Sequence, residues 1–147
     1  MPMRQEDLDR ALNKAGPIYR RVDTTIRAVE GDEKKNRFEL SFSSEKPVMR
    51  YGLPEIMLHT PEAVSLDRMR RSGALLFAHG RDPNYGLVPV GGFESITLDE
   101  KKRKCRAVVV LDEHDERAMA LARKMESGYL TGISVGALPI ERTLLTI

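Results

Sequence analysis

One short segment of the sequence is typical of a nucleophilic serine. Gly132-Ile133-Ser134-Val135-Gly136 matches the pattern G-x-S-x-G, which in α/β-hydrolases forms a sharp turn from a strand into a helix. Here a helical pattern precedes the segment and strand-like residues follow it. The hydrolase order also requires a histidine after the serine, and none follows Ser134. The segment therefore does not fit the α/β-hydrolase nucleophile turn.

A strand offers another interpretation of the same segment. Residues two apart share one face of a pleated strand, so Gly132 and Gly136 would flank the Ser134 hydroxyl on one face. A substrate backbone can approach such a serine closely, because its neighbours on that face lack side chains. The opposite face, with Ile133 and Val135, suits the core. The alternative is an incidental serine in a strand weakened by glycine, and the motif alone leaves both interpretations open.

A serine nucleophile needs a base, and histidine is the usual one because its pKa lies near neutrality. His114 lies among acidic residues at the start of a helical pattern, which predicts exposure to solvent. His59 precedes Thr60 and Pro61 and is expected to end a strand. His79 follows the apolar run 74–78 and precedes a turn, so we expect it at the mouth of a buried strand and select it as the base. A histidine held by hydrogen bonds in the core is the alternative at this position.

The rest of the chain predicts strands with a few helices. Residues 1–20 are expected to form an N-terminal arm with a short helix at 5–14, followed by a domain at 21–147. Helices are expected at 66–72, between Ser65 and Gly73 as caps, and from Asp112 to Gly128. We expect 47–54 to form a loop or sheet edge. Strands are expected at 22–28 and 38–42, joined as a hairpin, and at 56–58, 74–79, 87–98, 103–111, 129–138 and from 141 onward.

This order of elements predicts an α+β fold. We expect about six or seven strands in an antiparallel β-barrel or sheet, flanked by two or more helices. The apolar stripe of the second helix has helical spacing and is expected to face the core. It consists of Ala118, Leu121, Ala122 and Met125.

Several segments together resemble the phage prohead proteases, a family that shares the fold of the herpesvirus assemblins. Residues 74–82 are similar to the family's apolar strand that ends in the catalytic histidine. Residues 89–94 are similar to the Pro-apolar-Gly strand that follows it, and 115–136 to the helix and the strand that carries the nucleophile. The resemblance extends over roughly 22–138, and it lies in the order and spacing of segments that are each loose motifs.

The resemblance implies an antiparallel barrel ringed by helices and a serine endopeptidase. On this basis Ser134 attacks the peptide carbonyl, and His79 takes its proton and delivers it to the leaving amine. No metal or organic cofactor is implied. The implied substrates are a phage major capsid or scaffold protein and the enzyme itself, with self-association. The implied location is the cytoplasm of the bacterial host, inside the assembling procapsid.

Two features depart from the family pattern. The family's third catalytic residue, an acid or a second histidine, lies on a strand beyond the end of this sequence. The final apolar residues resemble the middle of a strand, so we expect that the domain is truncated at its C-terminus. Glu141 is a poor substitute for the missing residue, and Asp82 is expected to serve a turn. A backbone N–H near Ser134 is the expected oxyanion donor.

Composition excludes several other classes of protein. The chain has 147 residues, 41% of them hydrophobic, which fits one domain with a real core. A net charge of +2, few aromatic residues and no Trp argue against nucleic-acid binding. The basic run 101–104 lies between two expected strands and is expected to be a solvated hairpin tip, with a phosphate-binding patch of a sequence-tolerant nucleic-acid binder as the alternative. Cys105 is the single cysteine, is expected to point inward, and rules out an internal disulfide. No signal peptide or membrane span is evident, which predicts a soluble intracellular protein.

The competing function is a non-catalytic capsid-assembly or scaffold module with the same fold. The two functions differ in one geometric requirement. An enzyme must bring His79 Nε2 close to Ser134 Oγ, whereas a packing module has no reason to unite these two residues.

Overall fold

The structure is a computed structural model that describes residues 4, 6–7, 10, 18–50 and 52–137. The helix expected at 5–14 and the strand expected from 141 lie outside the described residues. The elements that the structure defines are β1 (Ile18–Asp23), β2 (Arg27–Ala28), β3 (Arg37–Ser44), β4 (Val48–Arg50), β5 (Leu53–Glu55), α2 (Asp67–Ser72), the 3₁₀ helix η1 (Phe77–Gly80), β6 (Gly91–Asp99), β7 (Lys104–Leu111), α3 (Glu116–Glu126) and β8 (Gly132–Ala137).

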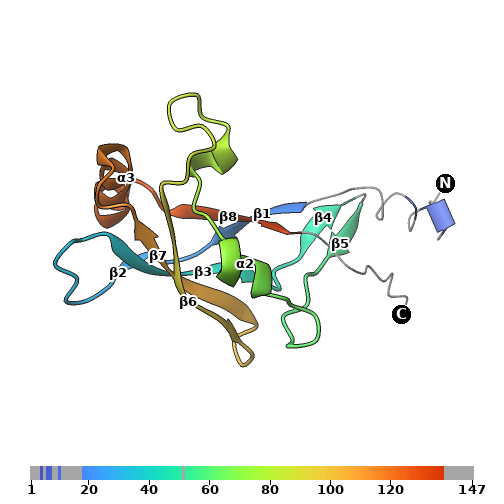
Figure 1. Cartoon of the computed structure of the whole chain (residues 1–147). Helices are drawn as coiled ribbons and strands as arrows, with labels where there is room; N and C mark the ends of the chain where they lie inside the picture. Colours follow the sequence, from blue (N-terminus) through green and yellow to red (C-terminus); the bar gives the residue numbers. More distant parts are fainter. Residues whose placement is uncertain (1–3, 5, 8–9, 11–17, 51, 138–147) are drawn as a thin grey trace.

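The strands form antiparallel sheets, which confirms the α+β class. The main sheet has the order β2-β3-β7-β6, while β1 pairs with β8 and β4 pairs with β5. The β1–β8 pair lies against β3, yet it is not hydrogen-bonded into the main sheet. Within the described residues the expected closed barrel is therefore absent. Figure 1 shows α3 at one end of the molecule and the β4–β5 hairpin at the other.

The core lies between the main sheet and α3. Alternate residues of β3 and β7 point inward, and Val109 in the middle of β7 is fully buried. Each large apolar side chain buried in this way contributes roughly 1.5–3 kcal/mol. The inward direction of Cys105, most of the α3 stripe and the alternation expected in β7 are confirmed, whereas in β3 burial alternates only up to Leu40 and Ser41 and Ser43 are buried as well. The buried core side chains are Phe38, Leu40, Phe42, Val90, Cys105, Ala107, Val109, Leu111, Ala118, Leu121 and Ala122.

The helix boundaries differ from those expected. Asp115, and not Asp112, caps α3, because its carboxylate accepts a hydrogen bond of 2.9 Å from the backbone N–H of Arg117. α2 begins after Leu66 without a side-chain cap, so Ser65 does not have the expected role. Gly73 has an extended backbone after α2, whereas Gly128 has a φ of +80° and ends α3 as expected.

Several expected elements were wrong or incomplete. Residues 24–26 interrupt the strand expected at 22–28. Residues 56–58 are irregular, because Ile56 and Leu58 remain about half exposed, at 50% and 60%, and have no sheet to join. Conversely, the segment 47–54, which was expected as a loop or edge, contains the β4–β5 hairpin. The β4–β5 hairpin is tied to β1 by a partly buried ion pair between Arg20 and Glu55.

The error at 74–79 affects the site directly. Only Leu75 makes a bridge, pairing with Gly91 at the start of β6. The chain then turns into η1, where Ala78 adopts a φ of +51° and Gly80 a φ of +78°. His79 therefore belongs to a 3₁₀ turn, and not to the end of a buried strand.

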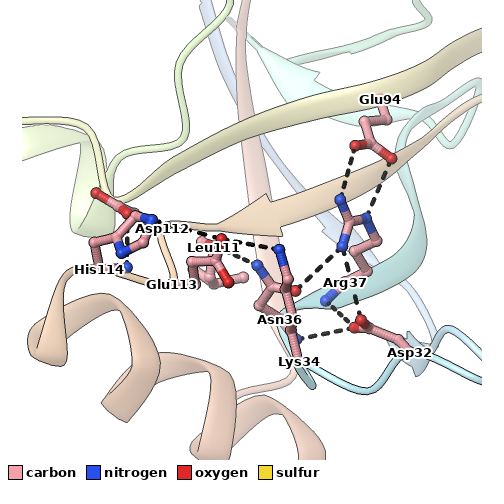
Figure 2. Close-up of polar contacts among 9 residues, drawn as sticks. All are labelled: Asp32, Lys34, Asn36, Arg37, Glu94, Leu111, Asp112, Glu113 and His114. Atoms are coloured by element: carbon pink, nitrogen blue, oxygen red, sulfur yellow. Dashed lines mark hydrogen bonds and ion pairs between the residues drawn. The ribbon is translucent and has the colours of Figure 1, made fainter.

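A polar cluster fixes the turn between β2 and β3 to the far end of β7 (Figure 2). The Asp32 carboxylate accepts hydrogen bonds from the backbone N–H groups of Asn36 and Arg37, at 3.0 and 2.9 Å. The Asn36 side chain, which is buried, donates to the Leu111 carbonyl at 2.8 Å. The Arg37 guanidinium forms an ion pair with Glu94 of β6. These contacts hold three strands of the main sheet in register.

β1 begins at Ile18, so it includes residues 18–20 of the segment expected as an arm, and all three pair with β8. No helix in the described part of the chain is long and apolar enough to cross a membrane.

Candidate functional site

Strand β8 presents Ser134 on the face expected from the sequence. Ser134 lies directly opposite Arg21 of β1, while its neighbour Ile133 lies opposite Val22. Val22 is buried and the partly buried Ile133 packs against the core. Arg21 and Gly132 are exposed, and Ser134 is partly exposed. The strand thus has one core face and one accessible face, and the Ser134 hydroxyl belongs to the accessible one.

His79 lies in η1, where the structure describes its backbone. The imidazole lies outside the described part of the structure. Ala78, immediately before it, holds a left-handed backbone that costs a non-glycine residue about 1 kcal/mol or more. Such strain persists only where surrounding contacts hold the chain in place.

Those contacts come from the start of α3. The rings of Phe77 and Tyr85, on either side of His79 in the sequence, lie with centroids 4.7 Å apart. The Arg117 guanidinium lies 5.7 Å from the centre of the Tyr85 ring and donates to the Asn84 carbonyl at 3.0 Å. The loop that carries His79 is therefore attached to the first turn of α3.

The other end of α3 leads into the strand that carries Ser134. The backbone N–H groups of Tyr129 and Leu130 both donate to the Lys124 carbonyl, at 2.9 and 3.1 Å. These bonds close the helix and direct the chain into β8 two residues later. One helix thus supports both segments that carry the predicted catalytic pair.

The loop around η1, the helix α3 and the residues just before β8 line one open hollow of about 500 Å³. Phe77 and Asp82 flank His79 in the sequence, and Leu130 lies just before β8. The lining is Phe77, Asp82, Tyr85, Leu121, Lys124, Tyr129 and Leu130. Among the described residues no residue of β8 lines this hollow, and the separation of the His79 and Ser134 side chains stays a prediction.

A second serine–histidine pair was missed by the sequence analysis. Ser43 Oγ lies 2.7 Å from His59 Nε2, and His59 Nδ1 lies 2.7 Å from the Met57 carbonyl. Because a carbonyl only accepts, Nδ1 carries the proton in the neutral ring and Nε2 accepts from the Ser43 hydroxyl. The backbone N–H of His59 also donates to Glu45 at 2.8 Å.

Burial separates this pair from a substrate site. His59 is 1% exposed and Ser43 is 5% exposed, so a peptide carbonyl has no access to the hydroxyl. The pair instead joins β3 to the segment before α2. His59 was expected as a strand-end residue, and it is a buried polar residue with all its ring nitrogens bonded. The sequence offered little to indicate this pair. Ser43 is one of the polar residues that alternate with Phe38, Leu40 and Phe42 along β3.

The remaining candidates have other roles. The His114 side chain is 86% exposed and lies 3.5 Å from Glu113, which confirms its exposed position (Figure 2). The basic run 101–104 lies at the turn between β6 and β7, as expected. Burial raises the pKa of the Cys105 thiol to about 11, which leaves it unreactive at neutral pH. No group of three or more potential metal ligands occurs among the residues that the structure describes.

Comparison with known proteins gives one informative similarity. Over 105 residues the chain is 31% identical to the major capsid protein of Halomonas phage phiHAP-1. The alignment covers 71% of this chain but only 17% of that protein. No protein-family model and no solved structure matches the chain. The sequence is therefore related to one part of a phage capsid protein.

Proposed function

We propose that the chain is a serine endopeptidase that acts on capsid or scaffold proteins, and on itself, during phage head assembly. The observation that supports the proposal is the hollow beside α3, whose lining includes Phe77, two residues before His79, and Leu130, four residues before Ser134. Strand β8 adds a partly exposed hydroxyl between two glycines. The similarity to a capsid protein supports the phage context.

In the proposed reaction Ser134 Oγ attacks the carbonyl carbon of the scissile peptide bond. His79 accepts the hydroxyl proton and then gives it to the leaving amine, which leaves an acyl-enzyme. A water molecule, deprotonated by the same imidazole, releases the second product and restores the hydroxyl. Glycine at 132 and 136 adds no side chain of the strand itself beside Ser134, while the Arg21 side chain extends over Gly132.

The alignment covers only a small part of the phiHAP-1 capsid protein, which suggests how a protease and its substrate could be joined in one polypeptide. The matched region is 17% of the phiHAP-1 capsid protein, so the rest of that polypeptide forms other parts. If the protease segment and the capsid segment are joined in this way, cleavage within one assembling shell needs no diffusive encounter. We propose the procapsid, in the bacterial cytoplasm, as the place of action.

A non-catalytic capsid-assembly module is the second candidate. The name of the relative, a major capsid protein, favours it. In that case β8 and η1 would only pack together, and Ser134 would have no raised reactivity. A chemical test separates the two candidates without knowledge of the cleavage sequence.

The test is labelling with a fluorescent serine-reactive phosphonate in the full-length protein. We expect the wild-type protein to be labelled, Ser134→Ala to be unlabelled, and His79→Ala to be labelled at least about 100-fold more slowly. Ser43→Ala is the matched control and should be labelled like the wild type, since its hydroxyl is buried. Circular dichroism would show that each variant is folded.

Two results would contradict the proposal. Labelling that persists in Ser134→Ala would place the nucleophile elsewhere. A folded wild-type protein that neither labels nor cleaves itself would support the assembly module instead.

A further inference from the structure

A positively charged side chain lies beside Ser134 on the accessible face of β8. Arg21 is exposed and lies opposite Ser134 in the β1–β8 pair. Its side chain extends over Gly132, two residues before the serine. A Cβ added at Gly132 would lie 3.0 Å from Nη2, 3.2 Å from Nε and 3.3 Å from Cζ of Arg21.

These three distances define how the guanidinium lies. Nη2 and Nε are nearer to this point than Cζ is, so the edge of the guanidinium that carries Nε and Nη2 is the part that lies over Gly132. A side chain at 132 would displace it, and glycine leaves the space that the guanidinium occupies. The N–H groups of a guanidinium point outward in its own plane, so those of Nε and Nη2 face the space above Gly132.

The position suits a neighbouring substrate side chain better than the reacting carbonyl. Residues two apart on a strand are separated by roughly 6.5–7 Å, so a group above Gly132 is too far from Ser134 to contact the carbonyl under attack. The guanidinium is instead placed to reach the side chain of a substrate residue one or two positions from the scissile bond. The rigid fork of an arginine matches a carboxylate, with two parallel charge-assisted hydrogen bonds.

We propose that Arg21 determines specificity by binding the carboxylate of an Asp or Glu side chain in the substrate, within two residues of the scissile bond. This inference rests on the proposed function, because it assigns the substrate class of the same site. Glycine at 132 and serine at 134 then have separate tasks. The first accommodates the arginine that selects the peptide, and the second cleaves it.

The test uses the full-length protein and quenched fluorescent peptides that differ only in Glu or Gln at each position near the cleaved bond. We expect the wild-type protein to cleave the best Glu peptide about 10–100-fold faster in kcat/KM than its Gln partner. Arg21→Gln should abolish that difference and leave cleavage of the Gln peptide within about threefold of the wild type. Arg21→Glu should favour the corresponding Lys peptide.

A matched control and a binding measurement separate the possible failures. Arg27→Gln, at an exposed arginine of β2, should keep the wild-type preference. If Arg21→Gln slows the Glu and Gln peptides equally, Arg21 has only a structural role, and the inference is overturned while the protease remains. Fluorescence anisotropy of the same peptides with Ser134→Ala protein tests the Arg21 preference without catalysis. If the Ser134→Ala protein bound the Glu and Gln peptides equally, the assignment of Arg21 would be overturned, whether or not the protein is a protease.

Discussion

Removing the hydroxyl of Ser43 should destabilise the protein without affecting its proposed chemistry. In Ser43→Ala the hydrogen bond of 2.7 Å to His59 Nε2 is lost. The imidazole cannot turn to another partner, because Nδ1 is fixed on the Met57 carbonyl. Since His59 is 1% exposed, water does not readily replace the missing hydroxyl.

The cost follows from the group that is left without a partner. A buried acceptor that loses its only donor costs about 1–3 kcal/mol, while the removed hydroxyl itself adds little because alanine fills most of the same space. We take about 2 kcal/mol as the central value. For a urea m-value of about 2 kcal/mol/M, typical of a small domain, the unfolding midpoint should fall by about 1 M.

The assay is urea unfolding of the wild type, Ser43→Ala and Ser134→Ala, followed by circular dichroism, together with phosphonate labelling of each folded protein. Ser43→Ala should lose stability and keep labelling. Ser134→Ala should lose labelling and shift the midpoint by less than about 0.3 M, because Ser134 is partly exposed and surface substitutions are usually within ~0.5 kcal/mol.

The opposite pattern would refute the reasoning. If Ser43→Ala removed labelling while it remained folded, the Ser43–His59 pair would be the reactive one, and its burial would not describe the active protein. If Ser43→Ala kept the wild-type midpoint, the hydrogen bond would contribute nothing, and the account of His59 as a structural residue would be wrong.

Three further predictions concern the frame of the fold. Burial raises the pKa of Asp32, but hydrogen bonds from backbone N–H groups outweigh this effect and hold the pKa below 3.8. The wild type should therefore be more stable than Asp32→Asn at pH 7, and the difference should shrink as the pH falls below about 4. Urea unfolding midpoints of the two proteins across this pH range would measure it. Cys105, with a pKa of about 11, should react with a disulfide reagent at pH 8 only after unfolding, since roughly one thiol in a thousand is ionised. Gly91→Ala would place a Cβ 2.1 Å from the Val110 carbonyl and should cost about 1–3 kcal/mol in thermal or urea unfolding. Gly92→Ala, where nothing lies within 4 Å, should be nearly neutral.

The sequence predicted those elements whose own side chains decide their structure. β3 and β7 alternate apolar and polar residues over their length, and α3 carries an apolar stripe at helical spacing. Each pattern requires a particular buried face, so strand or helix follows directly. The accessible face of Ser134 was predictable for the same reason, because Ile133 has to face the core.

The sequence failed where a distant partner decides the local structure. Residues 74–78 are apolar, yet a single bridge from Leu75 to Gly91 replaces the expected strand, and Ala78 turns the chain into η1. The pairing of Ser43 with His59 likewise depends on how the segment before α2 returns to β3. The closed barrel was expected chiefly from the resemblance to the prohead proteases. The alternation of residues along strands fits an open sheet as well as a closed barrel.

These errors also change how the proposed site would work. With His79 at the end of a buried strand, its position would depend on the sheet. In η1 it depends on α3 instead, through Arg117, Asn84 and the Tyr85 ring. The same helix sets the start of β8 through the Lys124 carbonyl. A rigid helix that holds two segments from its two ends fixes their separation without any direct contact between them. The alignment of the proposed catalytic pair is then a property of α3, whose buried stripe anchors it to the sheet.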